Sequence, residues 1–269
     1  MTDNAQQDAD RPADAFAENW LSLRAAADAR ARNIGLLGTL VERFAGAETL
    51  RVLDLGAGTG NNMRALASQL PGRQTWRLAD ADAGLLSRVM PIEGVTIETI
   101  TVDLAEGLAP LLDWRPDLVT ASALIDLAGA DWLDGVADAL AQHELPVYFA
   151  LSYTGRETWS PPNALDARVA AVFEADMGRD KGLGPSLGPA AHAHFADALR
   201  KRGFTVHAAA SDWRLEALRD GPLIAELATG TARAVRPALG PPADEWLAAR
   251  RGASAVLVSH SDLLGIPPA

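Results

Sequence analysis

The chain contains no cysteine among its 269 residues. Disulfide bonds, thiolate nucleophiles and zinc sites built from thiolates are therefore excluded. Histidine is scarce as well, since the chain has five, and only His192 and His194 lie close together in the sequence. A metal site would have to combine these rings with carboxylates. The sequence shows no dedicated spacing for such a set, so we expect no metal.

The sequence also lacks the signals of a membrane protein and of a nucleic-acid-binding protein. No apolar run reaches the ~20 residues that a transmembrane helix needs. The first residues, MTDNAQQDADRPADAF, are polar and acidic, without the basic and apolar regions of a secretion signal. The formal net charge of −11 opposes binding to the phosphates of nucleic acids. We therefore expect a cytoplasmic protein that binds neither nucleic acid nor a membrane. Its expected oligomeric state is a monomer or a homodimer.

Short apolar runs alternate with helical segments through the middle of the chain. Five of these runs read as strands: 50–56, 74–80, 95–104, a run within 116–127, and 145–153. Two further runs near the C-terminus, 204–216 and 253–264, also read as strands. Strands that alternate with helices at this rhythm predict βαβ units, and hence an α/β doubly wound fold with a mostly parallel sheet between two helical layers.

The segments around this alternation are expected to elaborate a single domain. Residues 1–15 are polar and read as a disordered tail. Residues 16–47 carry helical patterns and read as an N-terminal helical extension. Residues 48–269 form the predicted ligand-binding domain. Within it, an irregular stretch at about 154–190 and a proline-broken stretch at about 217–250 are expected to be cap insertions, because long irregular connections in compact domains are usually functional.

The stretch VLDLGAGTGNN, residues 52–62, ends an aliphatic run on an acid and follows it with three glycines at alternate positions, Gly56, Gly58 and Gly60. A glycine turn between a strand and a helix lets a ligand approach the backbone with no Cβ in the way. Free amides at the start of the following helix can receive an anionic group. Dinucleotides and S-adenosylmethionine (SAM) both use such a corner, so the stretch predicts a site for one of these two ligands.

The spacing of the glycines separates the two ligands. A dinucleotide fingerprint, G-x-G-x-x-G, needs a small residue three positions after its second glycine, and Asn61 stands there. The pattern D-x-G-x-G-x-G from Asp54 to Gly60 resembles instead the loop of class I SAM-dependent methyltransferases. The resemblance implies SAM as the cofactor, a seven-stranded sheet whose last strand is antiparallel, and methyl transfer as the activity. Two alternatives remain, an NAD(P)-dependent oxidoreductase at the same corner and a non-catalytic methyltransferase-like binding module.

The resemblance also implies roles for residues that follow the neighbouring strands. The family's acid after the second strand binds the ribose hydroxyls, which points to Asp80, with Asp82 as the less favoured substitute. The acid after the third strand accepts from the adenine amino group, beside an apolar residue that packs on the ring, which points to Asp103 and Leu104. Asp54 is expected to order the loop amides or to reach the aminoacyl end of SAM through water. Each of these acids could also be a turn former or a helix cap. The implied cofactor-binding residues are Asp54, Gly56, Gly58, Gly60, Asn61, Asp80, Asp103, Leu104 and Ser122.

Methyl transfer from a sulfonium is an in-line displacement, and many oxygen acceptors need a base as well. Three groups are candidates for that catalytic role: Asp126 after the fourth strand, Tyr153 after the fifth, and His194 on a helical segment. Each has a structural alternative. Asp126 could start a helix, Tyr153 could form a hydrogen bond at a strand end, and His194 could be a half-buried histidine of an amphipathic helix.

The acceptor is expected to be a small molecule. Arg24 and Arg156 could pair with an anionic acceptor or could be ordinary surface charges. Trp159, set among polar residues and two prolines, could stack on a flat acceptor. The predicted function is SAM-dependent methyl transfer to a nitrogen or oxygen of a small polar metabolite, for example a heteroaromatic or carboxylate-bearing one.

Overall fold

The computed structural model describes residues 13–268. Of the tail predicted at residues 1–15, residues 1–12 lie outside the described residues. Residues 13–15 begin a helix, α2 (Ala13–Ala31), which is followed by α3 (Ile34–Arg43). The chain therefore enters the domain through two consecutive helices.

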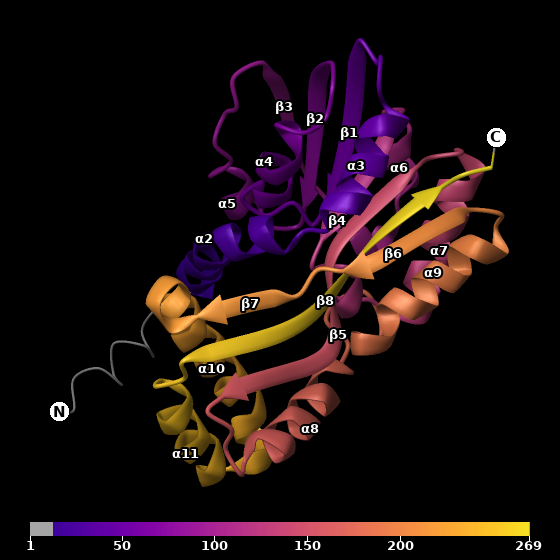
Figure 1. The fold of residues 1–269 in the computed structure, drawn as a ribbon. Coiled ribbons are helices and arrows are strands. Elements are labelled where there is room, and N and C mark those ends of the chain that lie inside the picture. Colours follow the sequence, from indigo (N-terminus) through magenta and orange to yellow (C-terminus); the bar gives the residue numbers. More distant parts are fainter. Residues whose placement is uncertain (1–12, 269) are drawn as a thin grey trace.

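A single mixed sheet of eight strands forms the middle layer (Figure 1). The strands are β1 (Thr49–Leu55), β2 (Arg73–Asp80), β3 (Val95–Thr101), β4 (Leu118–Ser122), β5 (Val147–Ser160), β6 (Thr205–Ala210), β7 (Trp213–Glu216) and β8 (Ala255–Ile266). Their order is β3-β2-β1-β4-β5-β8-β6, and β7 also pairs with β8. β1 to β5 run parallel, whereas β8 is antiparallel to β5, β6 and β7. The predicted fold class, with its antiparallel last strand, is confirmed.

The sheet has one strand more than the seven predicted. The run 204–216, predicted as one strand, is divided into β6 and β7 at Ser211 and Asp212. There the Ser211 N–H donates to the His260 carbonyl at 2.9 Å, but the His260 N–H donates to the Asp212 carboxylate at 3.1 Å. Because a side-chain acceptor replaces a backbone carbonyl, the ladder is interrupted, and β6 and β7 pair with successive parts of the long β8.

Helices cover both faces of the parallel part of the sheet. One face carries α3, α4 (Asn61–Ala67) and α5 (Ala83–Leu86), and the other carries α6 (Ala109–Leu112), α7 (Ala130–Gln142) and α9 (Ala191–Lys201). Neighbouring strand residues point to opposite faces, since Val52 packs in the cluster with α3 and α4 while Leu53 packs in the cluster with α7 and α9. The strands read as continuous apolar runs because both of their faces are buried.

The ends of β5 and β8 continue beyond the parallel sheet and form, with β7, one wall of a second lobe (Figure 1). The other wall consists of α8 (Asp166–Met177), α10 (Ala217–Leu239) and α11 (Pro241–Arg250). A third apolar cluster between the walls contains Trp159, Trp213 and Trp246. Residues 154–160, predicted as irregular, are therefore strand. Their pairing with β8, which sets Trp159 opposite Val256, overrides their polar composition.

A buried carboxylate ties the N-terminal helices to the sheet. A glycine at position 35 favours a helix break there, but the break lies at Asn33 and α3 begins at Ile34. Asn33 Oδ1 caps the helix by accepting from the Gly35 and Leu36 N–H groups, both at 3.1 Å. The Asn33 N–H in turn donates to Asp262 on β8 at 2.9 Å. Asp262 is fully buried, and it also accepts from the Tyr148 hydroxyl at 2.7 Å and from the Leu151 N–H at 2.9 Å. One side chain therefore joins α3, β5 and β8.

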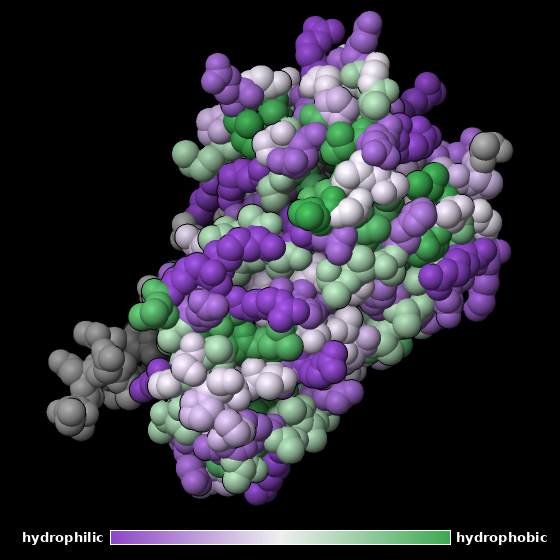
Figure 2. All heavy atoms as spheres, viewed as in Figure 1, coloured by the Kyte–Doolittle hydropathy of each residue, from purple (hydrophilic) through white to green (hydrophobic). Residues whose placement is uncertain are grey.

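The surface in view mixes polar and apolar residues (Figure 2). The large apolar side chains that are exposed among the described residues are Ile34, Met90 and Leu218. Single residues of this kind are common at protein surfaces and need no partner to explain them. No described helix combines the length and the apolar character that crossing a bilayer requires.

Replacing Asp262 by alanine should lower the free energy of unfolding by about 3 kcal/mol, because three buried donors lose their acceptor at once. Urea-induced unfolding measures the change. Asp197→Ala is the matched control. Asp197 is exposed on α9 and pairs only with Arg200 at 2.9 Å, so its removal should cost less than about 0.5 kcal/mol. Equal effects of the two substitutions would contradict the role of Asp262.

Candidate cofactor and active site

The glycine loop connects β1 to α4 through three residues of left-handed backbone. Gly56, Gly58 and Gly60 have φ values of 62°, 52° and 79°, a region that other residues enter only with strain. A Cβ on Gly56 would lie 3.1 Å from the Leu124 side chain, and one on Gly58 would lie 3.2 Å from the Leu21 side chain. Glycine is thus required by both the conformation and the close approach of neighbours.

The acid after the second strand lies against this loop. One oxygen of Asp80 accepts from the Gly58 N–H at 2.7 Å, and the other accepts from the Asp82 N–H at 2.9 Å. Asp82 itself caps α5, where it accepts from the Leu85 N–H at 3.0 Å. The two neighbouring acids are therefore distinguished by the structure, because only Asp80 contacts the glycine loop.

Asp80 and Asp103 line one cavity together with Gly56 and Leu104; its volume is about 310 Å³. Asp103 is exposed and caps the short helix η1 (Leu104–Glu106) by accepting from the Ala105 N–H at 2.9 Å. Leu104 is buried, and its carbonyl accepts from the Trp132 indole N–H at 2.8 Å. Two carboxylates from neighbouring strand ends and an apolar side chain thus meet at the glycine corner. We call this space the larger cavity.

A second cavity of about 120 Å³ lies on the other side of the loop, and Gly56 and Ala123 line both. We call it the smaller cavity. Other residues that line it include Leu21, Arg24, Gly58, Asn61 and Ser122. The Asn61 amide donates to the Leu21 carbonyl at 2.7 Å, which fixes α2 over the start of α4. Gly60, by contrast, lines neither cavity, because it faces Met63 and Val89 beneath the loop.

Asp54 is fully buried under the loop at the end of β1. Its Oδ1 accepts from the Asn62 amide at 2.6 Å and from the Thr120 hydroxyl at 2.8 Å, while its Oδ2 has no partner. Burial raises the pKa of Asp54 to about 6, because the bonds from Asn62 and Thr120 and the charge of Arg32 offset the lost hydration only in part. Asp54 thus anchors the first turn of α4, and no loop amide among the described residues donates to it. The alternative, that it reaches the aminoacyl end of SAM through water, stays a prediction.

Arg32 is a polar residue of this site that sequence reasoning missed. It lies between α2 and α3, is only 5% exposed, and donates from Nη2 to the Ser122 hydroxyl at 3.4 Å. Its Nε and Nη1 form no hydrogen bond with the described residues. Arg32 lines neither cavity and interacts electrostatically with Asp54 and Tyr148, so its positive charge acts from behind Ser122. The linear pattern gives no signal for this burial, because it depends on where α2 ends.

The three catalytic candidates occupy different places. Asp126, in the short helix η2 (Ile125–Leu127) after β4, is 8% exposed, and one of its oxygens has no partner. Burial raises its pKa, while the charges of Arg24 and Lys181 lower it. Tyr153 lies on β5 near Asp126, with its ring against Phe173 and His260. Neither Asp126 nor Tyr153 lines either cavity, although Leu124 and Leu127, on both sides of Asp126 in the chain, line the larger one.

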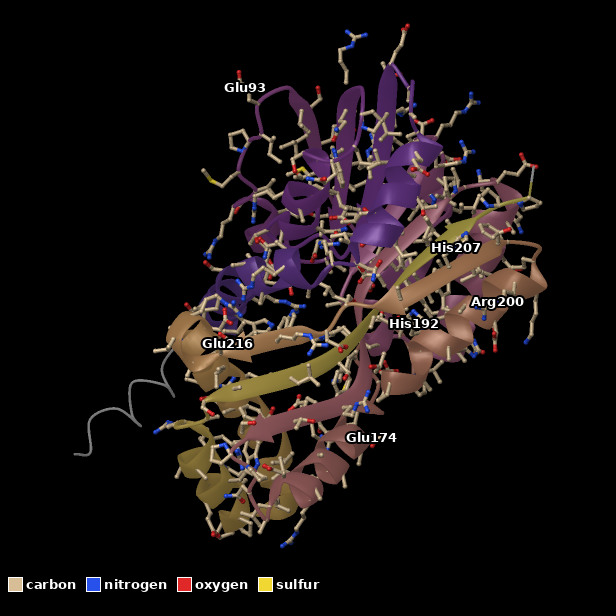
Figure 3. All side chains as sticks on the ribbon, viewed as in Figure 1. Glu93, Glu174, His192, Arg200, His207 and Glu216 are labelled. Carbon is tan, nitrogen blue, oxygen red and sulfur yellow. The ribbon has the colours of Figure 1, made fainter. Side chains whose placement is uncertain are left out.

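His194 is not part of the cleft. It lies on α9 with its Nε2 3.3 Å from Asp134 of α7, on a flank of the sheet that Figure 3 marks by the labels of His192 and Arg200. The structure therefore removes it from the catalytic candidates, and the structural alternative, a half-buried histidine of an amphipathic helix, holds.

The three residues predicted to bind the acceptor also lie in different parts of the structure. Arg24 lines the smaller cavity, where its Nε donates to Asp28 at 2.9 Å and its guanidinium lies 5.0 Å from the Trp213 ring centre. Trp159 is 4% exposed and packs edge-on against Trp246 in the second lobe, so it is not free to stack on a ligand at the glycine corner. Arg156 is exposed and lines neither cavity.

The loop between α8 and α9 closes over the end of β4. The Gly129 N–H donates to the Leu183 carbonyl at 2.9 Å, and the Ser186 hydroxyl donates to the Leu127 carbonyl at 2.7 Å. Lys181 and Leu183 of this loop line the larger cavity. Part of the predicted cap thus forms a wall of the candidate site.

Comparison with known proteins bears on the fold of this site. No family model and no curated protein sequence matches the chain. Among solved structures, a "putative methyltransferase" from Bacillus halodurans superposes with a TM-score of 0.52 at 14% identity, over 87% of this chain and 99% of that chain. A "putative methyltransferase from antibiotic biosynthesis pathway" of Anabaena variabilis gives 0.50 at 13% identity, over 88% and 98%. The YcgJ protein of Bacillus subtilis gives 0.50 at 15% identity, over 88% and 100%.

The chain has the class I methyltransferase fold. Within this methyltransferase fold the residues at the glycine corner fit SAM. The larger cavity presents two carboxylates and Leu104, the shared wall at Gly56 has no Cβ, and the smaller cavity presents the Arg24 guanidinium. A dinucleotide fits less well, because Asn61 stands where its fingerprint needs a small residue, and the Asn61 amide is held by the Leu21 carbonyl at 2.7 Å.

The buried Asp54 makes a pH-dependent contribution to stability. An acid whose pKa is raised on folding, here from 3.8 to about 6, stabilises the fold only at low pH, and this contribution is lost as the pH rises through about 6. The free energy of unfolding of the wild type should therefore fall relative to Asp54→Asn between about pH 4 and pH 7, by up to about 3 kcal/mol. Urea unfolding of both proteins across this range measures it. A difference that stays constant with pH would contradict the burial of an unpaired carboxyl oxygen.

Proposed function

We propose that the protein binds SAM at the glycine corner and transfers its methyl group to a nitrogen or oxygen of a small polar acceptor. One observation carries the proposal: Asp80 and Asp103, from the ends of β2 and β3, line the same cavity as Gly56. Carboxylates at these positions suit the ribose hydroxyls and the adenine amino group, because a carboxylate accepts two hydrogen bonds from neighbouring donors.

The two cavities suggest where the two parts of the cofactor would bind. The adenosine would lie in the larger cavity, with its ribose on Asp80 and its ring between Leu104 and Asp103. The aminoacyl part would cross Gly56 into the smaller cavity, where the Arg24 guanidinium can pair with its carboxylate. The unpaired donors of Arg32 lie behind Ser122 and add positive charge to the same end.

SAM, when bound, supplies a methyl group on a positively charged sulfur. The chain's own part is to hold the acceptor in line with that methyl group and to exclude water, which the loop carrying Lys181 and Leu183 can do. If the acceptor loses a proton, Asp126 is the candidate to take it, because it lies in the chain between Leu124 and Leu127, which line the larger cavity. Its buried, unpartnered oxygen and raised pKa give it the character of a general base.

The two other functions predicted from the sequence receive less support. An NAD(P)-dependent oxidoreductase would need a small residue at position 61, where Asn61 stands with its amide bonded to the Leu21 carbonyl. A non-catalytic module would be expected to fill the cofactor cleft with its own side chains, whereas cavities of about 310 Å³ and 120 Å³ flank the loop. The placement of Arg156 and Trp159 outside these cavities also removes two reasons for a carboxylate-bearing or heteroaromatic acceptor.

Alanine at position 80 should weaken SAM binding about 10- to 100-fold, the cost of two lost hydrogen bonds to a charged acceptor. Isothermal titration calorimetry with SAM and S-adenosylhomocysteine measures the change. The matched control is Asp82→Ala, which removes a neighbouring acid that caps α5 and should change the affinity by less than about threefold. Absence of SAM binding to the wild type, or equal losses in both variants, would contradict the proposal.

Methyl transfer itself is tested with SAM labelled in its methyl carbon and a fraction of small cellular metabolites. We expect the label to appear in a small molecule together with stoichiometric S-adenosylhomocysteine, and Asp80→Ala to reduce this at least about fivefold at SAM concentrations near the wild-type Kd. Transfer of the label to protein or nucleic acid alone would refute a small-molecule acceptor.

A further inference from the structure

A third cavity lies in the second lobe, away from the glycine loop. Its volume is about 110 Å³, and β5, α8, α10 and α11 all contribute to its lining. We call it the chamber. Its aromatic walls are Tyr153, Phe173, Trp159 and Trp246. A space of this size admits one small group of a ligand, on the order of a few non-hydrogen atoms, rather than a whole drug-sized molecule.

Four aromatic rings contribute to the lining, beside the aliphatic side chains of Ala167, Val169 and Ala170. The Arg250 guanidinium already lies 5.7 Å from the centre of the Trp159 ring. Trp159 and Trp246 pack edge-on with ring centres 5.3 Å apart, and Tyr153 and Phe173 do so at 6.5 Å. Both indole N–H groups are already used, since Trp159 donates to Glu157 at 3.2 Å and Trp246 donates to Asp166 at 2.8 Å. Aromatic rings of this kind attract cations through their negative faces.

Glu157 supplies an unpaired negative charge to the chamber. The nearby Asp166 is matched by Arg250 of α11, with N–O distances of 3.0 and 3.1 Å. The Trp159 indole is the single hydrogen-bond partner that Glu157 has among the described residues, and no described lysine or arginine pairs with it. Two carboxyl groups, those of Glu157 and Asp166, therefore face a single guanidinium, that of Arg250. Whenever Glu157 is ionised, one negative charge has no counter-ion among the described residues.

A second polar atom in the lining also lacks a partner. Thr231 on α10 is only 3% exposed, and its hydroxyl makes no hydrogen bond in the described structure. Buried hydroxyls are satisfied in most proteins, so an unsatisfied one that lines a cavity indicates a missing partner there. Glu157 and Thr231 come from opposite walls of the chamber, β5 and α10.

From these contacts we propose that the chamber binds the ammonium group of the methyl acceptor, with Glu157 as its counter-ion. This inference rests on the proposed function, because it assigns the cation to the acceptor. Tyr153 lines the chamber and interacts electrostatically with Asp126, whose chain neighbours Leu124 and Leu127 line the larger cavity. The chamber therefore lies on the side of the cofactor site that carries the end of β4. The acceptor is thus a small organic cation whose ammonium group is held in the chamber.

Binding of a cation should be linked to the ionisation of Glu157. Burial, and to a smaller extent the charge of Asp166, raise the pKa of Glu157 to about 7, while the Trp159 indole lowers it. The other charged or titratable groups around the chamber are Tyr153 on β5, Glu174 on α8, Arg250 on α11 and His260 on β8, whose pKa burial lowers to about 3. A cation favours the ionised carboxylate, so its affinity should rise as the pH increases through about 7 and then level off.

Tetramethylammonium is a suitable probe, because its charge does not change with pH. Titration of the full chain is followed on the indole N–H signals in the NMR spectrum, with those of Trp159 and Trp246 reporting on the chamber. We expect saturable shifts of these two signals, and an affinity at least about tenfold higher than that of tert-butanol, a neutral molecule of similar size. Raising the pH from about 6 to about 8 should strengthen the binding of the cation and not that of the alcohol.

Two variants assign the effect to Glu157. Glu157→Gln keeps the shape of the side chain, and should weaken tetramethylammonium binding at least about tenfold and remove its pH dependence. Glu174→Gln is the matched control, since Glu174 is an exposed carboxylate on α8 (labelled in Figure 3) that does not line the chamber, and it should change the affinity less than about twofold.

The outcomes separate this inference from the proposed function. SAM binding without tetramethylammonium binding, or cation binding that is unchanged in Glu157→Gln, would overturn the assignment of the chamber and leave the cofactor site standing. Cation binding without SAM binding would instead overturn the proposed function and remove the reason to call the cation a methyl acceptor. The inference is supported if the wild type binds both SAM and tetramethylammonium and Glu157→Gln loses only the binding of tetramethylammonium.

Discussion

The hydrogen bond from the Gly58 N–H to the Asp80 carboxylate is the contact on which the candidate site depends. It joins the loop after β1 to the end of β2, at 2.7 Å, and so brings a carboxylate to the loop in which Gly56, Gly58 and Gly60 carry no side chain. The parallel sheet makes this possible, because the carboxyl ends of adjacent strands meet at one edge. The proposed position of the cofactor's nucleoside depends on this contact between the loop and Asp80.

The residues that could be predicted from the sequence are those whose position follows from the order of strands. Gly56 and Asp80 lie at the ends of β1 and β2, so the prediction of two adjacent parallel strands is sufficient to place them together. Arg32 and Glu157 could not be predicted in the same way. The burial of Arg32 depends on the helix break at Asn33, and the position of Glu157 depends on the pairing of β5 with β8, a contact between segments about one hundred residues apart.

The second lobe accounts for the misplaced acceptor residues. The polar sequence neighbours of Trp159 favour a free aromatic side chain, but β5 continues through this region and buries the ring against Trp246. The prediction that His194 is catalytic is wrong for a related reason, since its helix packs on α7 instead of facing the cleft. In both cases a long-range contact that the sequence does not display decided which way the side chain points.

The most direct test of the account is a crystal structure of the protein with S-adenosylhomocysteine. The account predicts the nucleoside in the larger cavity, with both ribose hydroxyls within hydrogen-bond distance of Asp80 and the adenine beside Leu104 and Asp103. A ligand bound elsewhere, or an Asp80 carboxylate that contacts only the Gly58 and Asp82 N–H groups at saturating ligand, would contradict it.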